Sequence, residues 1–170
     1  MATKPTDHVA GLILAGGLSG VASYLGIYVG GWGAIWTWFS FGPGLIFGII
    51  ISLYYHHFLK LKSSKIIPFI VGSTASYCVA YNATVGISHD MDNITPLSLL
   101  VGGAIGTFLL LLTFSYTITR IKLPSFIGLL ILGSILSLSY YVSPEYLKLI
   151  IFFFIWQAVM AGAIRWATKN

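Results

Sequence analysis

Residues 96–119 read PLSLLVGGAIGTFLLLLTFSYTIT, a continuous run without a charged residue. This length is close to the roughly 20 residues with which an α-helix crosses about 30 Å of hydrocarbon. Five further apolar stretches of similar length precede and follow it. The sequence therefore predicts an all-α, polytopic membrane protein that forms one integral domain over residues 1–170. Its six transmembrane helices are expected at about 9–31, 43–59, 66–87, 96–119, 123–142 and 146–164.

The composition excludes a soluble protein. The chain is 57% hydrophobic and only 8% charged, whereas about a quarter of the residues of a soluble domain are charged. Its net charge of +5 comes from residues beside the apolar stretches, where they contact lipid headgroups. We therefore expect the lipid bilayer as the main partner, together with further copies of the chain or another membrane protein, and no nucleic acid.

The charges between the apolar stretches predict the topology. If the faces of the membrane alternate along the chain, eight of the nine basic residues fall on one side, and Lys148 falls on the other with three of the four acids. Basic loops stay in the cytoplasm. We therefore expect an inner or plasma membrane protein whose N- and C-termini are both cytoplasmic. The basic side holds Lys4, Lys60, Lys62, Lys65, Arg120, Lys122, Arg165 and Lys169.

One connection, residues 31–42, is expected to be long. It reads GWGAIWTWFSFG and carries three of the five tryptophans without any charge. Because tryptophan favours the headgroup level, we interpret it as a segment that lies across the outer rim of the protein. The alternative is a re-entrant lid, which other parts of the protein would have to cover.

Three glycine pairs with a spacing of four predict where helices touch. Such a pair lies on one face of a helix and allows two backbones to approach closely. We expect helix packing at these pairs, which are Gly16 and Gly20, Gly44 and Gly48, and Gly102 and Gly106.

The chain also resembles itself at a shift of 86 residues, which places Gly16, Gly17 and Gly20 on Gly102, Gly103 and Gly106. A true repeat would relate residues 1–87 to residues 88–170. Three helices in each half would force the halves to insert in opposite orientations, as in many transporters. The alternative explanation is a composition so biased that such matches arise by chance.

Polar side chains within the spans are the candidates for a path or a substrate site. Ser73, Tyr77, Tyr81 and Thr84 follow helical spacing on the third span, with Asn82 beside them, and shorter stripes occur at Thr113 and Thr117 and at Ser134, Ser137 and Tyr141. Such stripes either line a wet cavity or hydrogen-bond between helices.

Three further polar residues add to these candidates. His56 and His57 lie near the cytoplasmic end of the second span, where they either serve a path as a pH-sensitive mouth or point at headgroups. Gln157 in the sixth span, like Asn82, must find a partner in lipid. That partner is either another helix or a substrate.

The sequence contains no set of residues that indicates an enzyme. Residues 17–20 have the GxSG form of an intramembrane serine protease, but the histidine that would accompany it on the sixth span is absent. Cys78 is the sole cysteine, so a cysteine-bound metal site is excluded. We expect no catalytic activity, no metal and no cofactor.

These observations favour a small-solute or ion channel or transporter whose path lies between two three-helix halves. The alternative is a non-catalytic membrane subunit that packs against other membrane proteins. A path requires polar stripes that converge on the interior, whereas a subunit of that kind requires small residues that face lipid.

Overall fold

The computed structural model describes residues 5–29, 31–88, 94–144 and 147–168, and only the backbone of residues 5–7, 27–29 and 31–39. Within these ranges the chain is helical and contains no strand. The elements in chain order are α1 (Pro5–Val29), α2 (Gly31–Leu59), the short 3-10 helix η1 (Ser63–Lys65), α3 (Ile66–Ser88), α4 (Pro96–Thr117), α5 (Leu123–Ser137), α6 (Ser139–Val142) and α7 (Lys148–Ala167).

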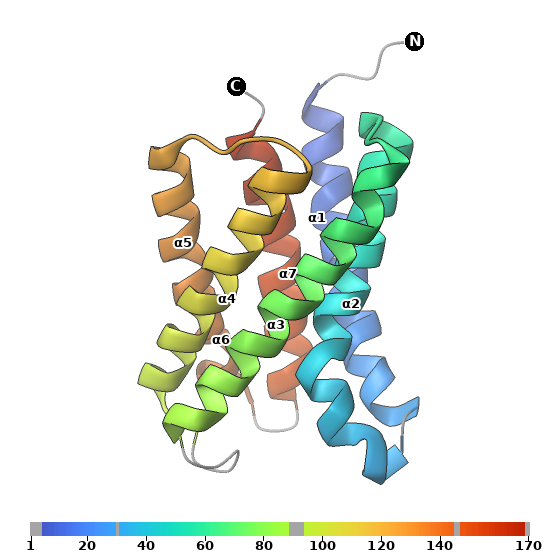
Figure 1. Cartoon of the computed structure of the whole chain (residues 1–170). Coiled ribbons are helices and arrows are strands. Elements are labelled where there is room, and N and C mark those ends of the chain that lie inside the picture. Colours follow the sequence, from blue (N-terminus) through green and yellow to red (C-terminus); the bar gives the residue numbers. More distant parts are fainter. Residues whose placement is uncertain (1–4, 30, 89–93, 145–146, 169–170) are drawn as a thin grey trace.

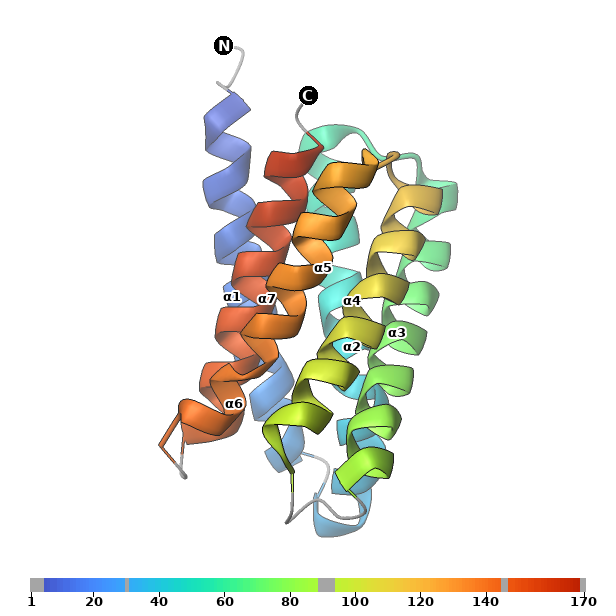
Figure 2. The same cartoon turned by 90° about the vertical axis from the view of Figure 1, so that its left-hand side faces the viewer.

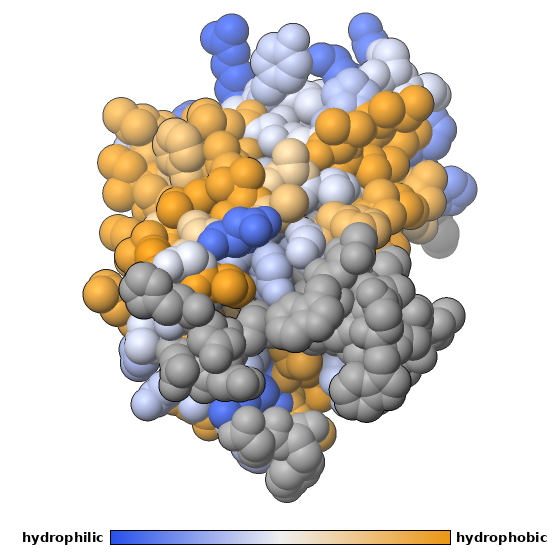
Figure 3. All heavy atoms as spheres, turned by 60° about the horizontal axis from the view of Figure 1, so that its bottom comes forward, coloured by the Kyte–Doolittle hydropathy of each residue, from blue (hydrophilic) through white to orange (hydrophobic). Residues whose placement is uncertain are grey.

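The prediction of an all-α protein with six membrane spans is confirmed. In the described part of the chain, six helical segments are long and apolar enough to cross a membrane, and α5 and α6 together make up one of them. Figure 3 shows apolar residues over the flanks, while hydrophilic residues gather at the far edge of the view. A multi-pass membrane protein follows from this combination of length and surface.

Both ends of the chain lie at the same end of the helix bundle (Figure 1). The connections from α2 to α3 and from α4 to α5, which carry Lys60, Lys62, Arg120 and Lys122, lie there too. We call this end of the molecule the basic end. The described basic residues of these two connections thus lie together, as the charge pattern predicted, whereas Lys4, Lys169 and the acids Asp90, Asp92 and Glu145 lie outside the described residues.

The structure corrects the predicted long connection at residues 31–42. These residues are not a loop or a re-entrant lid but the first turns of α2, which runs without a break from Gly31 to Leu59 and contains Pro43 in its interior. A continuous helix satisfies its backbone hydrogen bonds internally, which lipid cannot do for an irregular segment. With 29 residues, α2 is about 43 Å long and exceeds the hydrocarbon core.

The ends of the later helices differ in how well the sequence marks them. Thr95 caps α4, because its hydroxyl accepts from the Ser98 N–H at 3.2 Å and Pro96 follows it. The fifth span, predicted as one helix over 123–142, is instead interrupted at Leu138. There the Leu138 N–H donates to the Ile135 carbonyl at 3.0 Å, a tighter turn than that of an α-helix.

The six spans form a closed ring in chain order. Each packs against the next, and α7 completes the ring by packing along α1 (Figures 1 and 2). The contact between α1 and α7 is the most extensive, although these two helices are the farthest apart in sequence. The ring encloses an interior in which side chains from all six spans can meet.

This ring does not confirm the predicted inverted repeat. Seen from the basic end, α1, α2 and α3 follow one another around the ring in the same sense as α4, α5 and α7. Because α1 and α4 start at opposite ends, each half seen from its own starting end winds in the opposite sense to the other. Halves related by an axis in the membrane plane would wind in the same sense, so the order of the ring gives the repeat no support and it stays a prediction. Close helix contacts require small residues in both halves, which also accounts for the glycines shared at the 86-residue shift.

Candidate functional site

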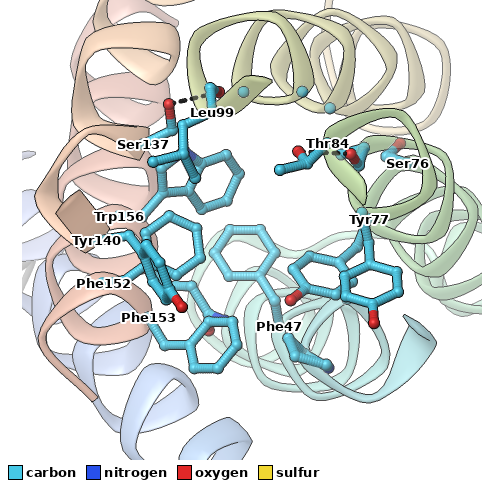
Figure 4. Close-up of a pocket in the computed structure, with 18 of the residues that line it drawn as sticks. Phe47, Ser76, Tyr77, Thr84, Leu99, Ser137, Tyr140, Phe152, Phe153 and Trp156 are labelled. Carbon is cyan, nitrogen blue, oxygen red and sulfur yellow. Dashed lines mark hydrogen bonds between the residues drawn. The ribbon is translucent and has the colours of Figure 1, made fainter. Parts of the chain in front are cut away.

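A cavity of about 120 Å³ lies inside the ring, in the half of the molecule away from the basic end. Among the residues whose side chains are described, its lining comes from every span except α1. Figure 4 shows side chains from these helices pointing into a common space. The lining is rich in aromatic residues, namely Phe47, Tyr77, Tyr81, Tyr140, Phe152, Phe153 and Trp156.

The walls of the cavity differ in character. α6 and α7 supply most of the rings, with Tyr140, Phe152 and Trp156 on one side of the space in Figure 4. α4 contributes Leu99 and Leu110 together with Gly102, Gly103 and Gly106. A Cβ at Gly102 or Gly106 would meet α3, and one at Gly103 would meet Ser137 of α5, so these glycines allow the walls of the cavity to pack closely on one another.

The cavity ends at a layer of tightly packed side chains, which we call the plug. Phe47 lines both the plug and the cavity. Tyr55 and Phe69 each pack edge-to-face on Phe114, with ring centroids 5.5 and 6.0 Å apart. The space between them has no volume for a water molecule. The plug consists of Phe47, Ile51, Tyr55, Phe69, Phe114, Ala161 and Ile164. The interior therefore contains a cavity in one half and is closely packed in the other.

The predicted polar stripe on the third span divides between two environments. Ser73, Tyr77, Tyr81 and Thr84 all line the cavity. Asn82 does not, because its side chain is exposed on the flank and its amide donates to the Cys78 carbonyl of its own helix at 2.7 Å. The structure thus brings four of these five residues together and places the fifth toward lipid.

The stripe on the fifth span reaches the cavity through one residue. Ser137 lines it, and its hydroxyl lies within hydrogen-bonding distance of the Leu99 carbonyl of α4, at 2.7 Å. Ser134 bonds to the Leu130 carbonyl of its own helix, and Tyr141 is 56% exposed on the flank. On α4, the hydroxyl of Thr117 donates to the Thr113 carbonyl at 2.6 Å. Neither threonine lines the cavity.

Gln157 also lines the cavity, but its amide is held by α1. Its Oε1 accepts from the Ser19 hydroxyl, and its Nε2 donates to the Ser23 hydroxyl at 3.2 Å. All three side chains are buried. These contacts supply the interhelical partner that the sequence required for a glutamine in lipid.

The structure places His56 and His57 away from the cavity. Both are exposed near the end of α2. The Nδ1 of His56 donates to the Leu61 carbonyl at 2.7 Å, and the ring of His57 contacts Phe58, with centroids 4.6 Å apart. Neither histidine belongs to the plug or to the cavity lining.

All three predicted glycine pairs lie at helix contacts inside the ring. A Cβ at Gly16 or Gly20 would meet the α7 backbone, at 2.5 Å from the Phe153 carbonyl oxygen in the case of Gly20. Gly44 and Gly48 face α3 in the same way, and Gly102 and Gly106 face α3 from α4. In contrast, a Cβ at Gly86 or Gly128 would have nothing within 4 Å.

The aromatic residues of α2, α6 and α7 are the part of the site that the sequence did not predict. Phe152, Phe153 and Trp156 have the spacing of one helix face, so a search for aromatic rather than polar stripes would have found them. Phe47 and Tyr140 carry no such signal, because only the ring arrangement brings α2 and α6 beside α7. Among the described residues, no three His, Cys, Asp or Glu side chains gather in a way that could hold a metal ion.

The chain matches no protein-family model, no curated protein and no solved structure. The arrangement of the cavity, the plug and the ring therefore carries the assignment of function.

Proposed function

We propose that the protein is a carrier of a small organic solute across the cell membrane, with the cavity as the binding chamber and the plug as its closed gate. The observation that carries this proposal is an interior that holds a cavity in one half and is tightly packed in the other. Carriers bind their substrate near the middle of the membrane and expose it to one side at a time. If the basic end is cytoplasmic, as its charge favours, the chamber faces the outside.

The fate of the small residues supports a carrier over an accessory subunit. A subunit that packs on other membrane proteins would present its glycine faces to lipid. Here the three glycine pairs lie at contacts between helices of the ring. The polar and aromatic side chains of several helices converge on the interior instead.

The chemistry of the cavity favours an organic solute over an inorganic ion. A bare inorganic ion needs several oxygen ligands to replace its hydration shell. Among the described residues that line the cavity none is charged, and the hydroxyls of Ser73, Ser76 and Thr84 donate to backbone carbonyls. The dry plug also argues against a continuous pore.

Flux into liposomes tests the proposal. Purified protein is reconstituted, and uptake is measured for a panel of small organic solutes of positive, negative and zero charge, with inorganic ions for comparison. Leu99→Trp places a larger side chain in the cavity. It is expected to reduce flux at least about tenfold, because the chamber loses its free volume. The control is Leu112→Trp on the same helix, where Leu112 is 46% exposed on the flank.

Equal flux in both tryptophan variants would place the path elsewhere. If the folded native protein moves no solute of the panel, the carrier proposal fails and the accessory subunit becomes the better explanation.

A further inference from the structure

Several polar side chains of the cavity wall are bonded to backbone carbonyls or to α1. The hydroxyl of Ser73 donates to the Gly44 carbonyl at 2.8 Å, and that of Thr84 donates to the Ala80 carbonyl at 3.0 Å. The Trp156 Nε1 donates to the Gly133 carbonyl at 3.1 Å, and Gln157 is bonded to α1. A guest in the cavity therefore finds few free hydrogen-bonding groups, and the ring faces are the main surface offered to it.

The cavity is also small. Its volume of about 120 Å³ is close to the roughly 150 Å³ of an apolar cavity that holds one benzene molecule. This space suits a compact guest of about six heavy atoms. A lipid acyl chain is far longer than the cavity.

The charge of the guest follows from what lines and surrounds the space. An anion is disfavoured because no described cavity residue is basic. A compact neutral apolar molecule dissolves in the bilayer and crosses it without a carrier. A cation does not cross unaided, and aromatic rings stabilise it through their negative faces. The sequence adds three acids and a single lysine, Lys148, on this side of the membrane, which favours the approach of cations.

One ring of the cavity already has an ammonium group beside it. The Nζ of Lys148 lies 5.7 Å from the centroid of the Tyr140 ring, and Tyr140 lines the cavity. This contact demonstrates the interaction on which a cationic guest would depend. It also puts a like charge at the rim, which would weaken the binding of such a guest.

We infer that the cavity binds a small organic cation, of the size of a quaternary ammonium group with short substituents, held by the aromatic rings of α2, α3, α6 and α7. The inference deepens the proposed carrier function by naming its substrate class. The binding itself does not depend on transport. A quaternary ammonium group suits this site because its methyl groups spread the charge and need no hydrogen-bond acceptor.

Equilibrium binding to the purified full-length protein in nanodiscs tests the inference. The probes are choline and 3,3-dimethylbutan-1-ol, which have the same shape and differ in the positive charge. We expect saturable choline binding to the native protein and at least about tenfold weaker binding of the neutral alcohol. Leu99→Trp, which fills the chamber, serves as the blank for partition into lipid.

Two matched variants separate the ring faces from simple packing. Phe152→Leu keeps an apolar side chain in the cavity but removes one ring, so choline binding should weaken about fivefold while the neutral alcohol is unaffected. Phe154→Leu, two residues away and 47% exposed, should change neither. Lys148→Met should strengthen choline binding, because it removes a like charge from the rim.

The remaining outcomes distinguish the choline-binding inference from the carrier proposal. If the neutral alcohol binds as tightly as choline, or if choline binds equally to native protein and Leu99→Trp, the inference is overturned. Choline binding without flux in liposomes would leave the inference standing and defeat the carrier proposal. Flux of other organic solutes without choline binding would do the reverse.

Discussion

At the scale of single residues, Gln157 illustrates what position in the sequence can and cannot tell. A lone amide in the sixth span must have a partner, and this much follows from the cost of burying it in lipid. Its partner is the Ser19 and Ser23 pair of α1, more than 130 positions earlier in the chain. Asn82 had the same apparent status, yet it bonds only to its own helix and faces outward.

This difference leads to a prediction for a matched pair of substitutions. Gln157→Leu removes two hydrogen bonds between α1 and α7 and should lower the free energy of unfolding by about 1 to 2 kcal/mol. Asn82→Leu removes only a bond within one helix from an exposed position and should change it by less than about 0.5 kcal/mol. Unfolding in detergent micelles by titration with a denaturing detergent measures both. Equal losses would show that the link between α1 and α7 contributes nothing to stability.

At the scale of the elements, close helix contacts depend on glycines whose role the sequence already suggested. The spacing of four indicated the contact faces, but not which helix each glycine would meet. The spacing of the α1 glycines fits any neighbouring helix equally well. The closure of the ring brings these glycines onto α7.

The glycine contacts give a second prediction. At Gly16 the obstacle to a side chain is the Gln157 carbonyl of the α7 backbone, which cannot rotate away. Gly16→Leu should therefore force α1 and α7 apart and destabilise the protein by about 3 kcal/mol. Gly86→Leu is the control, because a Cβ there meets nothing within 4 Å. The fraction of folded protein after extraction into mild detergent distinguishes them, and similar yields would argue against the contact between α1 and α7.

The elements also show where local reasoning fails. The second span was predicted to begin at Pro43, and the aromatic run before it was interpreted as a surface segment. Instead, α2 passes through both. Proline marks a helix start only when the preceding residues have a better alternative than helix. In lipid they have none, because every backbone group must be bonded within the protein.

At the scale of the whole molecule, the ring places both termini and the basic connections at one end (Figure 1). The positive-inside rule assigns that end to the cytoplasm. This assignment rests on charge alone, because the helices would pack in the same way with either end inside.

Labelling of single cysteines in a Cys78→Ala background tests the topology. Lys62→Cys and Lys122→Cys lie at the basic end and should react with a membrane-impermeant maleimide only after the cells are permeabilised. Pro144→Cys, exposed at the other end, should react in intact cells. Reaction of position 62 or 122 in intact cells would invert the molecule and turn the chamber toward the cytoplasm.

The sequence by itself determined the solvent, the number of spans and the separation of charge. These follow from composition and from stretches whose length is set by the bilayer, which are properties of each segment alone. It also indicated the glycine faces and most of the polar stripe on α3, because helical spacing is local.

Only the tertiary structure decided that the spans form a ring in chain order, and that this ring holds a cavity next to a packed plug. The cavity lies between the rings of α6 and α7 on one side and α3 and α4 on the other (Figure 4). These walls come from segments far apart in the chain, so no segment alone specifies the space between them. A helix in lipid can turn any of its apolar faces inward at little cost, since its neighbours are as apolar as the lipid, and close packing of the whole set makes the choice.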